Sequence, residues 1–218
     1  LAGMTNVRRI VALSRTPVRG TNKIFSHHID LEDVKSIEVA AQFTKTVLQD
    51  IHVVIVASGL LHDKAMQPEK ALRQIDGDNF GRAMAVNAIG PALVIKHFAP
   101  LMPRTGKTVL AVISARVGSI SDNHLGGWYA YRASKAAVNQ IVRTASIEIA
   151  RNNPDAIAIS LHPGTTNTTL SKPFQGSVTK GQLFSADHSA DCMLRVVDGL
   201  SALDSGKFFS WDGAELPY

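Results

Sequence analysis

Short runs of apolar, largely β-branched residues alternate along the whole chain with longer segments of helical periodicity. The apolar runs have the length and composition of strands that helices cover on both faces. They predict strands over residues 9–14, 23–30, 51–57, 108–114, 156–162 and 207–210. Helices are predicted over residues 31–49, 77–101, 129–152 and 187–203. Pro91 is expected to interrupt the second helix, and the third is expected to end before Pro154.

This alternation predicts an α/β fold: a doubly wound parallel sheet with helices on both faces, the three-layer Rossmann-type arrangement. Repeats, low-complexity tracts and Gly/Ser linkers are absent from the sequence, so residues 1–218 are expected to form a single domain. Ligands of such sheets bind at the carboxyl ends of the strands. The residues expected at those ends are Ser14, Arg15, Asp30, Ala57, Ser58, Gly59, Ser114, His162, Pro163 and Gly164.

The composition is that of a globular protein, with 45% hydrophobic and 19% charged residues. No apolar stretch approaches the roughly 18 residues of a membrane span, and the start of the chain lacks the apolar run of a signal peptide. The single Cys192 is expected to be a buried structural thiol, and these features together favour the cytoplasm. The net charge of +5 comes from scattered Lys and Arg, which does not indicate a nucleic-acid partner.

Tyr131 and Lys135 are four residues apart in a predicted helix, so their side chains share one face. A lysine cation beside a tyrosine favours the phenolate and lowers the tyrosine pKa from about 10. Such a tyrosine exchanges a proton with a carbonyl or an alcohol near neutral pH. The spacing alone occurs on many surface helices, but here the pair follows a buried strand ending in Ser114 and a glycine-rich loop.

Several motifs occur in an order that is typical of one family: residues 57–59, 87–90, 114–137 and 163–168. With these motifs the sequence resembles the short-chain dehydrogenase/reductase family, and it is especially similar to the C-factor-like subgroup. The resemblance implies hydride transfer between NAD(P) and a small-molecule carbonyl or alcohol on a Rossmann-type sheet. It also implies a homodimer or homotetramer, with the helices over 77–101 and 129–152 forming the contact.

The resemblance assigns catalytic roles to Asn87, Ser114, Tyr131 and Lys135. Tyr131 would be the general acid/base, and Lys135 would lower the Tyr131 pKa and contact the nicotinamide ribose. Ser114 would bind the substrate oxygen. Asn87 would hold a helix kink and a water that relays protons to Lys135.

The resemblance also implies a set of cofactor contacts. Ser58 and Gly59 would lie along the adenosine, and Asp30 would accept a hydrogen bond from the adenine amino group. Residues near the nicotinamide would be Pro163, Gly164, Thr166 and Thr168. An arginine after the second strand of the family suits the 2′-phosphate of NADP, whereas an acidic residue there suits NAD. Ser14 and Arg15 therefore favour NADP over NAD, although Arg15 also fits a solvated surface residue.

Three features depart from the family pattern. Ala115 stands where the family has its catalytic serine, so Ser114 or Ser119 must take that role, and Ser114 is the better candidate. Residues 56–59 read Val-Ala-Ser-Gly where the family has Asn-Asn-Ala-Gly. No strand with a glycine-rich turn precedes residues 10–14, so the family's first strand is expected to be missing from this chain.

These departures leave a second function open. A nucleotide-binding signalling protein of C-factor type, with little or no turnover, would keep the fold without the full chemistry. The histidines do not predict a metal site, because His27 and His28 are adjacent in a strand and point to opposite faces. His162 has no carboxylate or Cys partner at ligand spacing, so it is expected to pack at a strand end.

Overall fold

A computed structural model describes residues 1–179 and 181–218. Its strands are β1 (Ile10–Ser14), β2 (Ile24–His28), β3 (Val53–Val56), β4 (Thr108–Ile113), β5 (Ala156–His162), β6 (Thr165–Thr166), β7 (Leu183–Phe184) and β8 (Phe208–Ser210). Its α-helices are α1 (Val34–Val47), α2 (Gly77–Met84), α3 (Gly90–Phe98), α4 (Tyr129–Asn152) and α5 (Ala186–Gly199). The predicted α/β fold with parallel strands is confirmed, since every described strand pairing is parallel. The β6–β7 pair was not predicted, because each of its strands is only two residues long.

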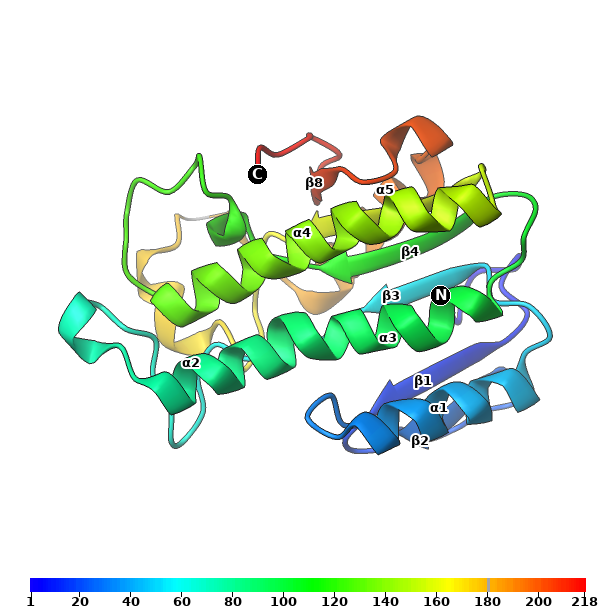
Figure 1. Cartoon of the computed structure of the whole chain (residues 1–218), viewed down its shortest axis with the longest axis horizontal. Coiled ribbons are helices and arrows are strands. Elements are labelled where there is room, and N and C mark those ends of the chain that lie inside the picture. Colours follow the sequence, from blue (N-terminus) through cyan, green and yellow to red (C-terminus); the bar gives the residue numbers. More distant parts are fainter. Residues whose placement is uncertain (180) are drawn as a thin grey trace.

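The strands do not form one continuous sheet. β3, β4, β5 and β8 pair in that order, whereas β1 and β2 pair only with each other. β1 and β3 are not paired, and Figure 1 shows them apart from each other. The resemblance implies that the first strand, which is expected to be missing, would be a central strand of the sheet.

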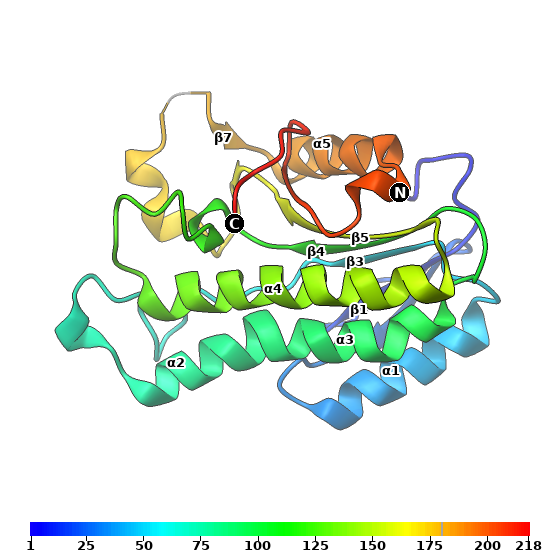
Figure 2. The ribbon, with the colours of Figure 1, turned by 45° about the horizontal axis from the view of Figure 1, so that its top comes forward.

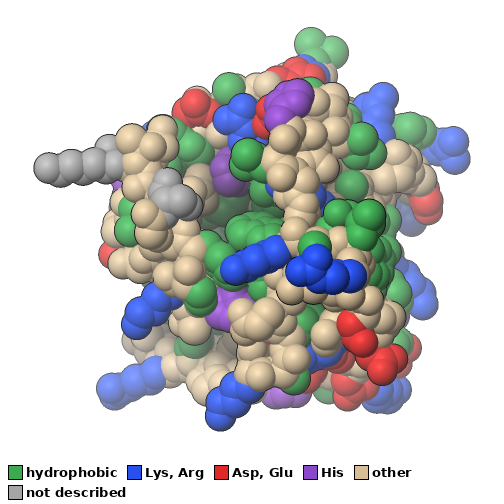
Figure 3. Space-filling model, turned by 90° about the vertical axis from the view of Figure 1, so that its left-hand side faces the viewer, with side chains coloured by type: hydrophobic (Ala, Val, Ile, Leu, Met, Phe, Trp, Pro, Cys, Tyr) green, Lys and Arg blue, Asp and Glu red, His purple; other side chains and the backbone are tan. Residues whose placement is uncertain are grey.

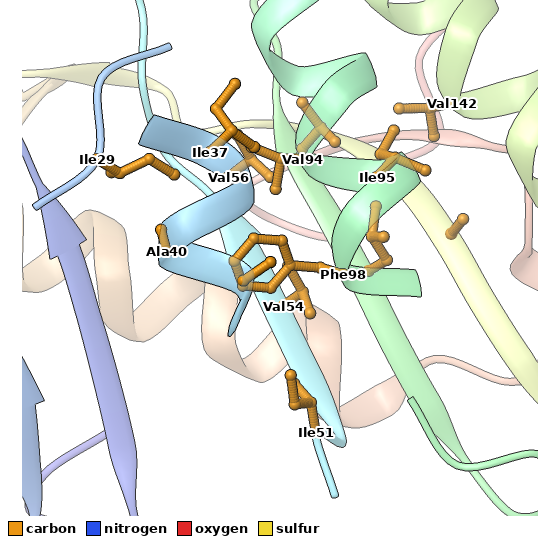
Figure 4. Packing of buried hydrophobic residues seen from close by; sticks show 14 of the residues in the cluster. Ile29, Ile37, Ala40, Ile51, Val54, Val56, Val94, Ile95, Phe98 and Val142 are labelled. Carbon is orange, nitrogen blue, oxygen red and sulfur yellow. The ribbon is translucent and has the colours of Figure 1, made fainter. Parts of the chain in front are cut away.

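Helices α1, α3 and α4 cover one face of the strands, and α5 lies on the other face (Figures 1 and 2). The larger apolar core lies beneath α1, α3 and α4, where Phe98 of α3 and Ala40 of α1 approach Val54 of β3 (Figure 4). A second core packs α5 against β4 and β5. Because α5 does not reach β3, Val53 and Ile55 on that side are 41% and 36% exposed. The expectation that this strand is covered on both faces is therefore wrong.

The predicted helix over 77–101 is interrupted, as expected, but the interruption is a π-helical turn over Ala85–Ile89 that precedes Pro91. Pro91 has no N–H to donate to the carbonyl of Asn87, four residues earlier in the chain. In the described part of the chain, only the segment Gly77–Leu101 is long and apolar enough to cross a membrane. A core helix has the same length and composition, and α3 packs against α1 and α4.

Candidate active site

The carboxyl ends of β3, β4 and β5 meet at one edge of the sheet, where α4 also begins. Figure 3 looks onto this side of the molecule, which is hollowed, with hydrophobic side chains at its centre and Lys and Arg side chains across it. The predicted residues Gly59, Asn87, Ser114, Tyr131 and Lys135 lie at this edge. They come from the loops after β3 and β4, from the π-helical turn and from α4, so only the fold brings them together.

Tyr131 and Lys135 lie on the buried side of the first turns of α4, as their spacing predicts. Tyr131 is 8% exposed and Lys135 is 3% exposed. The Lys135 ammonium donates to the Ile113 carbonyl at 2.9 Å and lies 5.8 Å from the centre of the Tyr131 ring. One of its three N–H groups is thus used by the end of β4, and two are left for other partners.

Burial sets the ionisation of this pair. It lowers the pKa of Lys135 to about 8 and raises the pKa of Tyr131 above its ordinary value of 10. The direction for Tyr131 is opposite to the lowering that the Tyr-x-x-x-Lys spacing suggested. The reason is that removing a phenolate from water is unfavourable.

Asn87 is fully buried in the π-helical turn, and its amide oxygen and nitrogen both bond to neighbouring segments. Its Oδ1 accepts from the Leu60 N–H at 2.7 Å, and its Nδ2 donates to the Leu60 carbonyl at 2.7 Å. Nδ2 also donates to the Ser134 Oγ at 3.0 Å. The predicted kink residue therefore ties the loop after β3 to α4.

Gly59 lies beside both Asn87 and Lys135. A Cβ at Gly59 would lie 3.7 Å from Asn87 Oδ1 and 3.7 Å from Lys135 Nζ. Gly118 allows its loop to pack closely against α4 at Lys135, because a Cβ at Gly118 would approach Lys135 Cβ to 2.8 Å. The backbone at Gly59 can therefore approach a ligand that contacts Lys135.

Both candidate serines are buried, but their hydroxyls have different partners. Ser119 Oγ accepts from the Asp122 N–H at 3.2 Å and lies 3.5 Å from Ser121 Oγ, within its own loop. Within the described residues, the one hydrogen bond of Ser114 Oγ is a long one of 3.5 Å to the Lys135 carbonyl. Ser114 is thus the hydroxyl at the end of β4 that is freer to bind a substrate oxygen.

Three further predicted contacts lie at the ends of β1 and β2. Ser14 Oγ donates to the Thr16 carbonyl, and Asp30 Oδ1 accepts from the Glu32 N–H at 3.0 Å. Arg15 is exposed, and its guanidinium has no hydrogen bond or ion pair within residues 1–179 and 181–218. Ser58, after β3, is exposed as well.

The segment after β5 is tightly packed. Gly164 has φ 73°, and a Cβ there would lie 2.6 Å from the Phe184 ring. The Thr166 hydroxyl lies 3.3 Å from the Pro163 carbonyl and 3.1 Å from Ser189 Oγ, whereas Thr168 is exposed. Of the two predicted threonines, Thr168 therefore has the side chain open to a ligand.

A group of packed aromatic rings lies beside Tyr131. The Trp128 ring packs edge-on against Tyr131, with ring centres 6.2 Å apart, and against Phe174 at 4.9 Å. The His62 ring lies 5.6 Å from Phe174, and its Nε2 is 3.0 Å from the Leu170 carbonyl. His62 and Phe174 were not predicted from the sequence, because no local pattern distinguishes them.

Sequence reasoning also missed Glu69 and Arg132, which hold the turn before α4. Glu69 is 6% exposed and accepts from the Ala130 N–H at 3.3 Å. Arg132 donates to three carbonyls of the loop before the helix. The pair Gly126 and Gly127 was the one sequence signal that pointed to an unusual turn there.

The remaining polar residues behave as structural groups. Cys192 is 3% exposed, as expected, and receives a hydrogen bond from Arg195. The His27 ring packs against the Phe43 ring at a tilt of 31°, with ring centres 4.4 Å apart. Burial lowers the pKa of His162 to about 4, so this histidine is neutral at pH 7. The residues that the structure describes contain no cluster of His, Cys, Asp and Glu that could hold a metal ion.

Comparison with known proteins agrees with this arrangement. A family model described as enoyl-(acyl carrier protein) reductase matches residues 7–198. The C-signal protein of Myxococcus xanthus is 35% identical over 149 residues, which cover 68% of this chain and 84% of that protein. A 1-hydroxy-2-glutathionyl-2-methyl-3-butene dehydrogenase of a Rhodococcus species is 31% identical over 144 residues, covering 66% and 61% of the two chains.

Solved structures show the same fold. The NADPH-bound carbonyl reductase from chicken fatty liver superposes with a TM-score of 0.83 at 23% identity, over 97% of this chain and 88% of that one. The carbonyl reductase Sniffer of D. melanogaster gives 0.78 at 22% identity, over 91% and 79%. The chain belongs to the short-chain dehydrogenase/reductase family, a family of oxidoreductases.

Proposed function

We propose that this chain interconverts a small-molecule carbonyl and its alcohol with a nicotinamide cofactor, using NADP in preference to NAD. The observation that carries the proposal is the convergence of Gly59, Asn87 and Lys135 at the carboxyl edge of the sheet, beside Tyr131. The relative from Rhodococcus is named a dehydrogenase, and the chicken protein binds NADPH. These names favour an enzyme over the signalling alternative.

The residues present fit such a cofactor. The free N–H groups of Lys135 suit ribose hydroxyls, and the backbone at Gly59 leaves room beside them. Pro163, Gly164 and the exposed Thr168 would face the nicotinamide. The unpaired Arg15 would bind the 2′-phosphate, with Ser14, Ser58 and Asp30 nearer the adenosine. When bound, the nicotinamide supplies or accepts the hydride.

The protein supplies the proton. In carbonyl reduction Tyr131 donates its hydroxyl proton to the substrate oxygen, and Ser114 Oγ holds that oxygen by a hydrogen bond. The raised pKa of Tyr131 keeps the hydroxyl protonated at neutral pH until a substrate accepts the proton. Lys135, with a pKa of about 8, is cationic at pH 7 and stabilises the phenolate as it forms.

The test is consumption of NADPH and NADH by the full-length protein across a panel of aldehydes and ketones. We expect turnover with NADPH for at least one carbonyl class. Tyr131→Phe removes only the hydroxyl, so turnover should fall by roughly a hundredfold to ten-thousandfold while NADPH affinity is kept. A Tyr131→Phe variant with full activity would overturn the mechanism. A protein that binds NADPH but reduces no carbonyl would favour the signalling alternative.

The proposal includes a cytoplasmic homodimer or homotetramer. Its contact would use the outer faces of the helices over 77–101 and 129–152, where Ile89 and Ile147 are 53% and 51% exposed. Light scattering should give at least a dimer at micromolar concentration, and a monomer would count against this assembly.

A further inference from the structure

The turn that leads into α4 has an unusual backbone. Gly126, Gly127 and Trp128 have φ values of 65°, 66° and 54°, so three successive residues are left-handed. Trp128 is the only non-glycine residue with positive φ in the described part of the chain. It is also the N-cap of α4, and its indole forms no cap hydrogen bond with the described residues. Such a backbone persists only where surrounding groups hold it.

Arg132 is the first of these groups. Its Nε donates to the Gly127 carbonyl at 2.9 Å, and its Nη2 donates to the Gly126 carbonyl at 3.2 Å. Its Nη1 reaches back to the Val117 carbonyl at 3.2 Å, near the start of the same loop. One planar guanidinium therefore joins the two ends of the loop that connects Ser114 to Tyr131. A lysine could not supply three donors in these directions.

Glu69 holds the same turn from the opposite side. Its backbone carbonyl accepts from the Trp128 N–H, and its carboxylate accepts from the Ala130 N–H at 3.3 Å. This remote carboxylate does what an N-cap side chain does, and its charge lies at the positive end of a 24-residue helix. The contact is close, because a Cβ at Gly127 would lie 3.3 Å from the Glu69 carbonyl oxygen.

The clamped turn determines where two side chains of the site lie. Trp128 is the last left-handed residue, and its indole packs on Tyr131 and Phe174. Tyr131 follows it in the first turn of the helix. We propose that Glu69 and Arg132 are positioning residues that clamp the turn over 126–128 and thereby fix Trp128 and Tyr131 around the substrate. The kinetic part of this inference rests on the proposed function, whereas its structural part does not.

The test uses tryptophan as a local probe. The chain has two tryptophans, so a Trp211→Phe parent leaves Trp128 as the only one. In this parent we compare Arg132→Gln, Glu69→Ala and Glu69→Gln with Arg151→Gln as the matched control. Arg151 is an exposed arginine on the same helix. The readouts are Trp128 fluorescence, near-ultraviolet circular dichroism, NADPH affinity, and kcat and KM for a carbonyl substrate.

We expect Arg132→Gln and Glu69→Ala to shift the Trp128 emission to the red and to weaken its near-ultraviolet ellipticity. Their kcat/KM should fall by about tenfold to a hundredfold with NADPH affinity unchanged, because a small displacement of the reacting groups is enough for such a loss. Glu69→Gln keeps an acceptor oxygen and should recover most of the activity. Arg151→Gln should match the parent.

The inference is overturned if Arg132→Gln and Glu69→Ala have the Trp128 spectra and kcat/KM of Arg151→Gln, since a merely structural role lowers stability alone. If Arg132→Gln does not fold, Arg132→Lys takes its place and must show the same changes in smaller measure. If the parent reduces no carbonyl, the proposed function fails. The Trp128 spectra then test by themselves whether Glu69 and Arg132 hold the turn.

Discussion

Replacing Asn87 by alanine tests whether the loop after β3 is held by this one side chain. The asparagine is 0% exposed and makes three hydrogen bonds, two to the backbone of Leu60 and one to Ser134. Alanine leaves the N–H and the carbonyl of Leu60 without these partners. It also removes the link between that loop and the helix that carries Tyr131.

The size of the effect follows from these contacts. Each buried backbone group left without a partner costs about 1 to 3 kcal/mol, and the lost bond to Ser134 adds about 1 kcal/mol. Ser134 keeps its own donation to the Tyr131 carbonyl at 2.8 Å, so its hydroxyl is not orphaned. We therefore expect Asn87→Ala to lower the free energy of unfolding by about 3 to 7 kcal/mol. With a slope near 3 kcal/mol per molar urea, the midpoint would fall by roughly 1 to 2 M.

Urea unfolding followed by circular dichroism measures this change. The matched control is Ser134→Ala, which keeps both bonds to Leu60, removes the bond to Asn87 and the donation to the Tyr131 carbonyl, and should cost about 1 to 3 kcal/mol. The double variant should be less destabilised than the sum of the two, because the Asn87–Ser134 bond is counted in both. An Asn87→Ala protein no less stable than Ser134→Ala would refute the reasoning.

Three further predictions concern the cofactor, the substrate and acid stability. Arg15→Ala should lower NADPH affinity and leave NADH affinity unchanged in fluorescence titrations; an unchanged ratio would show that Arg15 does not read the 2′-phosphate. Ser114→Ala should reduce kcat/KM more than Ser119→Ala, and the reverse order would move the substrate contact to Ser119. Burial lowers the pKa of His162 to about 4 in the folded chain, whereas its pKa in the unfolded chain is the ordinary 6.5. Stability should therefore fall as the pH drops from 6.5 to 4, because the unfolded state binds the proton first. His162→Gln should flatten that fall in urea unfolding, and parallel curves for the two proteins would contradict it.

The sequence predicted the elements whose signals are local. The helix over 129–152 and the strand over 156–162 begin and end where the pattern placed them, because apolar periodicity and the flanking Pro154 act over a few residues. The four-residue spacing placed Tyr131 and Lys135 on one helical face. The alternation of strands and helices predicted the parallel α/β arrangement, and ordered motifs identified the family.

Only the tertiary structure decided how distant segments meet. Asn87 is 27 residues from Leu60 and 47 from Ser134 in sequence, and no local pattern links them. The clamp of Glu69 and Arg132 on the turn before α4 is equally non-local. The division between β1 and β3 depends on which strand edges pair, which apolar runs do not specify. The raised pKa of Tyr131 has the same origin: spacing shows that Lys135 is near, but the penalty for ionising the phenol depends on how much water the whole fold removes.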